Sequence, residues 1–311
     1  MDGILMTDAL TGCAVAVAAD GSSARVSEGG SRTRAASVFF PGCSMLNYAP
    51  ALVSTLSDYL AQAGVVDGTS LLCCGKILDF EDDGAARRAA VDEALRRAVE
   101  AAGTERIVAV CPNCAAALKR ALSTEAGAPG AEVVPLPKVL AELGCRIDPA
   151  TAREVLAAKG FAGKDTPKMW VHDSCPDRGD YDFGRGVRAM LPPEMLIKDN
   201  LEPSSRCCGS IARAAGRYEA ALAQGARRAE HAARHGADAM VTACMSCAAS
   251  LASAQDGLPV VHYLELLCDY PMNWRVAARP LSLRFLIENE WKAPDGGRDF
   301  ALLPAREGEA R

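Results

Sequence analysis

Short apolar runs alternate with longer amphipathic stretches along most of the chain. The short runs carry β-branched and aromatic residues, and the longer stretches repeat apolar positions every three or four residues. The first half predicts strands at 37–40, 70–73 and 106–111 and helices at 46–63, 84–102 and 112–123. The second half predicts strands at 168–172, 239–243 and 259–262, a largely helical stretch at 211–235 and a helix at 246–254. This alternation is typical of an α/β fold in which helices flank a parallel sheet.

The cysteines repeat at a nearly constant spacing between the two halves. The offsets are 132 positions from Cys43 to Cys175, 134 from Cys74 to Cys208, and 133 both from Cys111 to Cys244 and from Cys114 to Cys247. An internal repeat this long indicates two copies of one domain. We assign residues 36–150 to the first copy and 165–270 to the second.

The two ends of the chain lie outside the repeat. Residues 1–35 are rich in Gly, Ser and Ala and contain turn-forming sequences, which predicts a flexible extension. Residues 271–311 are interpreted as a C-terminal helix and tail. Apolar positions within 281–291 suit packing on the chain's own domain better than docking of a partner subunit.

Each half contains an isolated cysteine, then a Cys-Cys-Gly element, then a C-x2-C element. The first cysteine set is Cys43, Cys73, Cys74, Cys111 and Cys114, and the second cysteine set is Cys175, Cys207, Cys208, Cys244 and Cys247. The predicted elements place each group at or just beyond the carboxyl end of a strand, where parallel sheets gather their ligands. Each set is therefore expected to converge on one pocket.

The residues around these cysteines favour iron-sulfur ligation. Thiolates are the preferred ligands of iron-sulfur clusters. Pro112 is a suitable first helical residue, so Cys114 lies in a first turn, where free N–H groups stabilise an anion. Gly75 and Gly209 leave space where the backbone passes close to sulfur. Structural zinc stays an alternative, although five thiolates exceed its four positions, and a vicinal disulfide would leave the other cysteines unexplained.

Composition limits the classes of function. Thirteen cysteines are about 4% of the residues, below the roughly 8–10% of a disulfide scaffold. With 34 basic and 39 acidic residues the net charge is −5, and no long basic run is present to follow nucleic acid. The absence of a signal-like leader and of any apolar run of about 20 residues predicts a cytoplasmic protein without direct membrane insertion.

The doubled motif resembles the CCG domain, the cysteine-rich domain found twice in the B-type subunit of heterodisulfide reductase. Phe40-Pro41-Gly42-Cys43 opens the first copy and His172-Asp173-Ser174-Cys175 opens the second. The resemblance covers about residues 37–268. It implies two tandem, pseudo-symmetric, Rossmann-like domains in which each cysteine set holds a non-cubane [4Fe-4S] cluster, and it implies that the two clusters together reduce a bound disulfide.

The resemblance also implies partners. No C-x2-C-x2-C-x3-C-P run occurs in the sequence, so the cubane clusters that feed or drain such domains are expected on another polypeptide. A ferredoxin-like iron-sulfur subunit or a flavoprotein is the expected electron donor, and a partner could tie the protein to a membrane. Our leading hypothesis is an oxidoreductase subunit that acts on a small disulfide or thiol. An electron relay for a flavin-linked hydroxyacid or quinone-dependent dehydrogenase is the second hypothesis, and a zinc-stabilised interaction protein is the third.

Several further residues are candidates for supporting roles. His172 could donate a hydrogen bond to sulfur or a proton to a leaving thiolate, or it could be a buried histidine bonded to the backbone. Lys76, Arg178 and Arg206 adjoin proposed ligands and could offset cluster charge or hold an anionic substrate. The G-x-G-x-x-A segment at 184–189 is placed in a loop and is a weak match to a dinucleotide site. The cysteines outside both sets, expected to be packing residues, are Cys13, Cys145 and Cys268.

Overall fold

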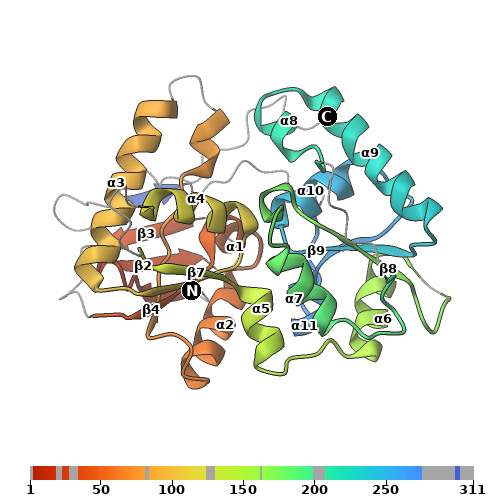
Figure 1. The fold of residues 1–311 in the computed structure, drawn as a ribbon, viewed down its shortest axis with the longest axis horizontal. Coiled ribbons are helices and arrows are strands. Elements are labelled where there is room, and N and C mark those ends of the chain that lie inside the picture. Colours follow the sequence, from red (N-terminus) through yellow and green to blue (C-terminus); the bar gives the residue numbers. More distant parts are fainter. Residues whose placement is uncertain are drawn as a thin grey trace. The chain divides into compact units, whose positions relative to one another are not determined.

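The computed structural model of the chain describes residues 3–18, 23–27, 34–80, 84–123, 130–161, 163–198, 207–274 and 298–301. The chain divides into two compact units (Figure 1). The first contains residues 1–109, 117–134 and 278–311, and the second contains residues 110–116 and 135–277. The predicted tail element at 281–291 lies outside the described residues.

The first unit contains a four-stranded sheet in the order β5-β4-β6-β7. Its strands are β4 (Ser37–Phe40), β5 (Gly68–Thr69), β6 (Arg106–Ala109) and β7 (Glu132–Pro135). The strand β4 pairs in parallel with β5 and β6, and its last three residues are buried. The helices are α1 (Gly42–Tyr48), α2 (Pro50–Gln62), α3 (Gly84–Ala102) and α4 (Pro112–Leu122), with a 3₁₀ turn η1 at Lys76–Phe80. Buried parallel strands with intervening helices confirm the predicted α/β architecture.

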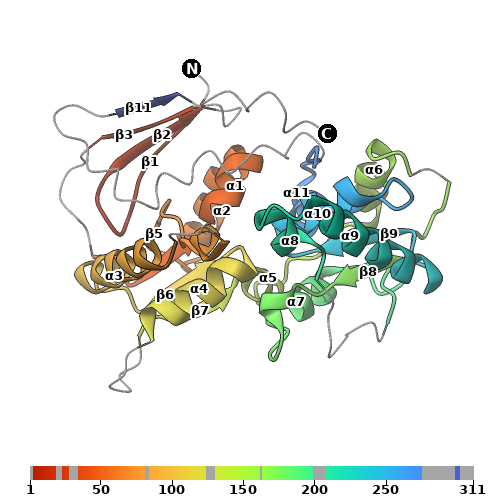
Figure 2. The ribbon, with the colours of Figure 1, turned by 90° about the horizontal axis from the view of Figure 1, so that it is seen from above.

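The second unit repeats this arrangement around three parallel strands in the order β10-β9-β8. The strands are β8 (Met169–His172), β9 (Ala239–Thr242) and β10 (Val260–His262), all of them buried. The helices are α5 (Leu136–Glu142), α6 (Pro149–Ala158), α7 (Asp182–Met190), α8 (Ser210–Ala214), α9 (Tyr218–Arg234), α10 (Met245–Ala254) and α11 (Tyr263–Cys268). Figure 2 shows α9 and α10 lying side by side. Among the described residues, no helix has both the length and the apolar character needed to cross a bilayer.

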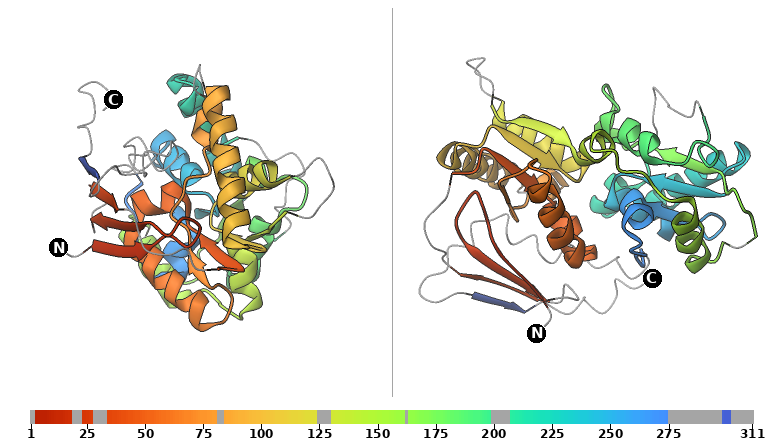
Figure 3. Two further views of the ribbon diagram at one scale, coloured as in Figure 1. Left: turned by 90° about the vertical axis from the view of Figure 1, so that its left-hand side faces the viewer. Right: turned by 90° about the horizontal axis from the view of Figure 1, so that it is seen from below.

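A separate antiparallel sheet is formed in the first unit by the N-terminal strands. Its order is β1 (Gly3–Thr7), β2 (Ala14–Ala18), β3 (Ser23–Ser27) and β11 (Arg298–Ala301). The right-hand view of Figure 3 shows the three red strands beside the dark blue β11. Residues 1–35 were expected to form a flexible extension, and the Gly- and Ser-rich composition gave no sign of these strands.

Asp8 connects this sheet to the chain that leads to Cys73 and Cys74. The Asp8 carboxylate is 1% exposed and accepts hydrogen bonds from Leu71 N at 2.6 Å and Ser70 Oγ at 3.0 Å. Burial raises the pKa of Asp8 even though these bonds oppose the shift. The same bonds explain why the predicted strand at 70–73 is wrong. Only Gly68–Thr69 pairs as β5. Ser70 N still donates to Phe39 O of β4, but Leu71 N donates to the Asp8 carboxylate instead of a neighbouring strand.

Two predicted helices are broken by local backbone geometry. The helix expected at 46–63 is divided between α1 and α2 at Ala49, whose φ of −150° is not helical. Pro50 follows Ala49 and disfavours the helical conformation at the residue before it. The helical stretch at 211–235 is likewise divided into α8 and α9, with Arg217 preceding the second helix.

The G-x-G-x-x-A segment lies in α7 and not in a loop, contrary to the expectation from sequence. A Cβ added to Gly186 would lie 2.5 Å from both Lys138 N and Pro137 C of α5. A Cβ added to Gly184 would lie 2.1 Å from Asp173 Oδ1. The two glycines therefore allow α7 to approach neighbouring groups, and this packing role accounts for them without a nucleotide.

Replacing Gly186 with alanine tests this packing role by the sign of its effect. On an exposed helix, Gly to Ala stabilises by up to ~1 kcal/mol. Here the new methyl group meets the α5 backbone, so we expect Gly186→Ala to lower the free energy of unfolding by about 1–3 kcal/mol. Urea unfolding followed by circular dichroism measures the change. A stabilised variant would mean that α5 and α7 are not packed as described.

Candidate metal centre

Three cysteines of the first cysteine set meet in the first unit. Cys43 is the second residue of α1 and follows Gly42, which turns the chain with a φ of 71°. Cys73 and Cys74 lie in irregular backbone beyond β5, and all three side chains are buried. The Cys73 thiol is hydrogen-bonded to Cys43 and to Cys74. The contact with Cys43, followed by the contact with Cys74 and by burial, raises the pKa of Cys73 well above the usual value. None of these three cysteines forms a disulfide. The first unit therefore contains three buried thiols in contact with one another.

The other two cysteines of the first set lie in the second unit. Cys111 follows β6, and Cys114 lies in the first turn of α4, as the sequence predicts. The Cys111 thiol contacts Cys114 and Cys244, and these two contacts lower its pKa well below the usual value despite burial. Asn113 Nδ2 donates to Cys244 Sγ at 3.6 Å. A sulfur of the first set therefore touches a sulfur of the second, a contact that spacing alone did not predict.

All five cysteines of the second set are linked by sulfur contacts within the second unit. Cys208 Sγ and Cys247 Sγ are 3.2 Å apart, Cys175 contacts Cys207, and Cys244 contacts Cys247. The positions follow from the elements. Cys175 opens the 3₁₀ turn η2 (Cys175–Asp177) after β8, and Cys244 is the N-cap residue of α10. The predicted placement at strand ends is confirmed for these two.

Cys207 carries the strongest acidic shift of this group. Hydrogen bonds from Cys175 and then Cys208, with the N–H of Gly209 at 3.4 Å from its sulfur, lower the pKa of Cys207 to about 2. The neighbouring thiols shift in the opposite sense, because each gives its proton to this contact. The pKa of Cys208 rises to about 11, and the hydrogen bond with Cys207 is the largest cause of this shift. The group thus favours thiolate at one sulfur and resists placing charge on all of them without a compensating cation.

The glycine after each Cys-Cys pair has a backbone conformation that other residues rarely adopt. Gly75 has a φ of 69° and Gly209 a φ of 98°. A Cβ on Gly209 would lie 2.3 Å from Ala221 O of α9, and one on Gly75 would lie 2.8 Å from Val91 Cγ1 of α3. From sequence, these glycines were assigned to space beside sulfur. The described contacts show instead that the turn needs left-handed backbone and that the following helix lies against it.

His172 is a predicted non-cysteine residue that lies beside thiols of the second set. A ring nitrogen of His172, Cys208 Sγ and Cys247 Sγ lie within 4.8 Å of one another, all buried. Arg228 Nε donates to His172 Nδ1 at 3.2 Å, and within the described part of the chain His172 Nε2 has no hydrogen-bond partner. Burial first, and then the charge of Arg228, lower the pKa of His172 to about 3. His172 is thus a neutral imidazole at physiological pH.

The donors present fit an iron-sulfur cluster better than a single zinc ion. Five sulfurs of the second set are linked in one place, one more than a tetrahedral zinc site uses. Two of the cysteine pairs begin helices, where backbone N–H groups point toward an anion. Cysteine thiolates would supply the ligands, and the cluster would supply one-electron chemistry.

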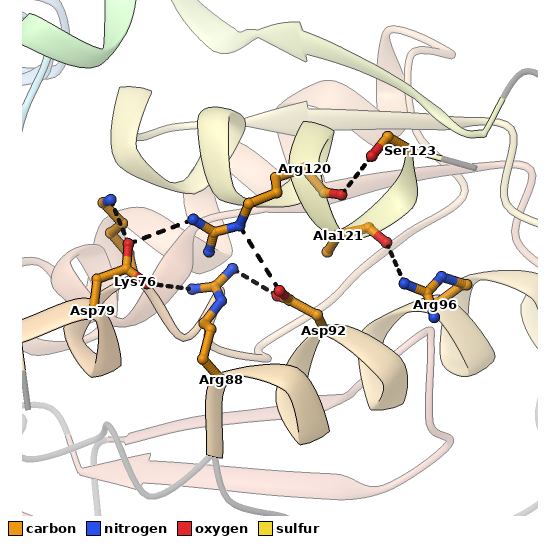
Figure 4. A network of polar contacts seen from close by, with 8 residues as sticks. All are labelled: Lys76, Asp79, Arg88, Asp92, Arg96, Arg120, Ala121 and Ser123. Atoms are coloured by element: carbon orange, nitrogen blue, oxygen red, sulfur yellow. Dashed lines mark hydrogen bonds and ion pairs between the residues drawn. The ribbon is translucent and has the colours of Figure 1, made fainter. Parts of the chain in front are cut away.

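Lys76, one of the basic residues predicted to act beside the cysteines, is bound in an ion-pair network. Lys76 lies in an ion-pair network in which Asp79 and Asp92 bind the side chains of Arg88 and Arg120, as drawn in Figure 4. Lys76 Nζ is 2.5 Å from Asp79 Oδ2. Burial opposes the shift, but Lys76 and then the two arginines lower the pKa of Asp79. This network joins η1, α3 and α4, so Lys76 has a structural use.

The remaining candidates differ in position. Arg178 is exposed in the turn after η2, and Arg206 lies outside the described residues. Cys13, Cys145 and Cys268 are half-buried. Burial, followed by the charge of nearby Cys145, raises the pKa of Cys268 to about 11. None of these three is among the sulfur contacts described for the two sets.

Comparison with known proteins agrees with this geometry. Residues 37–119 and 169–252 each match the cysteine-rich domain named CCG, and together they cover more than half of the chain. The chain belongs to the CCG family. Its two CCG domains include every cysteine of the two sets. A relative, the B subunit of the CoM/CoB fumarate reductase of Methanothermobacter marburgensis, is 27% identical over 74% of this chain and 45% of its own length. The chain therefore spans less than half of that relative.

Sequence reasoning missed one functional candidate in the second CCG domain, Arg228. Arg228 is 3% exposed and lies on the inner face of α9. Its Cζ lies over the ring of Trp170, 5.8 Å from the ring centroid. The signal was available in the repeat, because Arg228 stands 133 positions after Leu95, the same offset as the C-x2-C elements. A charged residue at a core position of an amphipathic helix is the observation that could have found it.

Proposed function

We propose that this CCG protein is the iron-sulfur subunit of an oxidoreductase and holds two non-cubane [4Fe-4S] clusters, one on each cysteine set. The observation that carries the proposal is the linkage of the second set through Cys175–Cys207, Cys208–Cys247 and Cys244–Cys247 contacts in a largely buried site without a disulfide. Buried thiols at this density need a multivalent cation centre to become thiolates together. The CCG family and the reductase relative support the oxidoreductase class.

The substrate we propose is a small disulfide, which is reduced to two thiols. Cleavage of one disulfide consumes two electrons and two protons. Two one-electron clusters supply the electrons, and solvent supplies the protons. Two complete cysteine sets in one chain match this requirement, because each would contribute one electron. His172, a candidate proton donor from sequence, is neutral and buried, so it fits a hydrogen bond to sulfur better than a proton source.

We propose that the electrons come from outside the 311 residues of this sequence. Only Cys13, Cys145 and Cys268 remain outside the two sets, which is too few to ligate a cubane cluster in this sequence. A ferredoxin-like iron-sulfur subunit or a flavoprotein is the partner we propose. A relay subunit for a flavin-linked or quinone-dependent dehydrogenase would use the same clusters without a disulfide of its own.

A reaction of the reduced protein with disulfides separates these two functions. The protein is purified anaerobically, reduced with dithionite, freed of excess reductant and mixed with oxidised low-molecular-weight thiols such as cystine and glutathione disulfide. We expect the visible absorption of the oxidised clusters to return and about two thiols to appear for every two electrons lost. A Cys207→Ser variant, lacking one cluster, is the matched control and should release thiol more slowly.

Two results would argue against disulfide reduction. If no disulfide of the panel reoxidised the clusters while a quinone did, the relay function would replace it. If the purified protein held zinc and no sulfide, both redox functions would fail and an interaction protein would remain.

A further inference from the structure

The two CCG domains differ at one pair of buried positions beside the cysteines. In the second domain, His172 ends β8 three residues before Cys175, and Arg228 lies on α9. The equivalent positions in the first domain are Phe40, three residues before Cys43, and Leu95 on α3. All four side chains are at most 3% exposed. A hydrogen-bonded polar pair thus stands in one half where the duplicated half has two apolar side chains.

The pairing of His172 with Arg228 decides which ring nitrogen carries the proton. A guanidinium donates and never accepts, so His172 Nδ1, 3.2 Å from Arg228 Nε, must accept. The neutral ring then carries its single proton on Nε2. That nitrogen is buried, has no partner among the described residues, and belongs to a ring that lies beside Cys208 and Cys247. A nitrogen of this ring lies within 4.8 Å of Cys208 Sγ and Cys247 Sγ, which makes these sulfurs the candidate acceptors of the proton on Nε2.

The same tautomer argues that His172 is not a metal ligand. A ligating imidazole binds through one nitrogen and donates its other N–H to an acceptor such as a carboxylate or carbonyl. Here the other nitrogen faces a donor, so metal binding at Nε2 would require an imidazolate. His172 therefore contacts the sulfurs of the ligands and does not extend the ligand set.

The buried arginines near the two cysteine sets have different surroundings. Arg88 lies close to Gly75 in the first domain, but Asp92 at 2.6 Å and Asp79 at 4.0 Å offset its charge. In the second domain the Arg228 guanidinium contacts the His172 ring and the face of Trp170. An N–H donor to a ligand sulfur favours the state of a cluster that carries the additional electron.

We propose that His172 donates a hydrogen bond from Nε2 to the sulfurs of the second cysteine set, that Arg228 holds it in this tautomer, and that the second cluster is in consequence reduced more readily than the first. His172 and Arg228 are positioning residues in this scheme. The inference rests on the two clusters of the proposed function but not on the identity of the substrate. It directs electrons toward the second CCG domain.

The test replaces the polar pair with the residues of the first domain. The double variant His172→Phe with Arg228→Leu restores an apolar pair and removes the buried charge together with its partner. We expect its iron and sulfide content to equal that of the wild type. An anaerobic redox titration followed by electron paramagnetic resonance measures the midpoint potentials of the two clusters. We expect the reduced-to-oxidised ratio of the second cluster to fall about tenfold at a given potential. This corresponds to a midpoint about 59 mV lower for a one-electron couple, and the midpoint of the first cluster should not change.

Two further variants separate a hydrogen bond from a change in packing. His172→Gln can accept from Arg228 through Oε1 and donate through Nε2, so it should keep the wild-type midpoint. His235→Phe makes the same ring exchange at an exposed site of the same unit and should leave both midpoints unchanged. Loss of iron from the double variant would identify His172 as a ligand, and unmoved midpoints would refute the hydrogen bond. Either result overturns this inference alone, whereas wild-type protein without iron and sulfide would refute the proposed function as well.

Discussion

Replacing Cys207 with serine is expected to remove about half of the iron and sulfide of the protein, roughly four of about eight iron atoms. Cys207 contacts both Cys175 and Cys208, and its pKa of about 2 makes it the most readily ionised thiol of the second set. A serine hydroxyl at that position is a much weaker acid and a harder ligand, so iron should be lost from one set only. Cys73→Ser should produce the same loss from the first set, because Cys73 joins Cys43 and Cys74.

Metal and sulfide analysis with electron paramagnetic resonance on anaerobically purified protein measures this outcome. Cys145→Ser is the matched control, because Cys145 is a half-buried cysteine outside both sets and should leave the iron content unchanged. Retention of full iron by both Cys207→Ser and Cys73→Ser would show that the assignment of ligands is wrong. Loss of all iron from either single variant would show that the two sets hold one centre, which the Cys111–Cys244 contact makes a specific alternative.

Replacing Glu265 with alanine is expected to cause the largest loss of stability in the second unit. The Glu265 carboxylate is fully buried and accepts from Lys159 Nζ at 2.7 Å, His262 N at 2.7 Å, Met272 N at 2.6 Å and Trp274 Nε1 at 2.7 Å. Removing it takes the acceptor away from the Lys159 ammonium, whose side chain is 15% exposed, and from three N–H donors. Breaking a buried ion pair in this way costs about 3–5 kcal/mol of the free energy of unfolding.

Anaerobic urea unfolding, followed by the fluorescence of Trp170 and Trp274 in this unit, measures the loss. Glu265→Gln should cost less than Glu265→Ala. Its amide oxygen still accepts, and burial already raises the pKa of Glu265 toward a neutral side chain although Lys159 opposes this. Glu142→Ala, an exposed acid at the end of α5, is the control and should change stability by less than about 0.5 kcal/mol. Equal midpoints for Glu265→Ala and this control would contradict the described contacts.

Local patterns were sufficient wherever the chemistry depends on neighbours in sequence. The strand at Ser37–Phe40 and the helix at Gly84–Ala102 occur as predicted, because their periodicity and end residues agree with their burial. Cys114 lies in a first helical turn, as Pro112 at the helix start predicts, and Cys247 has the same position in α10. The α/β class and the two CCG domains follow from the same signals.

Patterns failed where a distant side chain competes for backbone groups or where packing reassigns a residue. The Asp8 carboxylate accepts from Leu71 N, sixty-three positions away, so that the apolar run there does not continue as a strand. Gly184 and Gly186 look like a phosphate loop in sequence, yet α5 and Asp173 lie against them. Neither competitor can be identified from the segment itself.

The sequence by itself determined the duplicated α/β domains, the ten cysteines and their placement at strand ends and helix starts, because these depend on short-range periodicity and on spacing. Only the tertiary structure decided that Cys111 meets Cys244 and that Arg228 donates to His172. The residues of the second pair are separated by 56 positions. Their contact depends on which face α9 turns toward β8, and that rotation is set by the packing of the whole unit rather than by any local pattern.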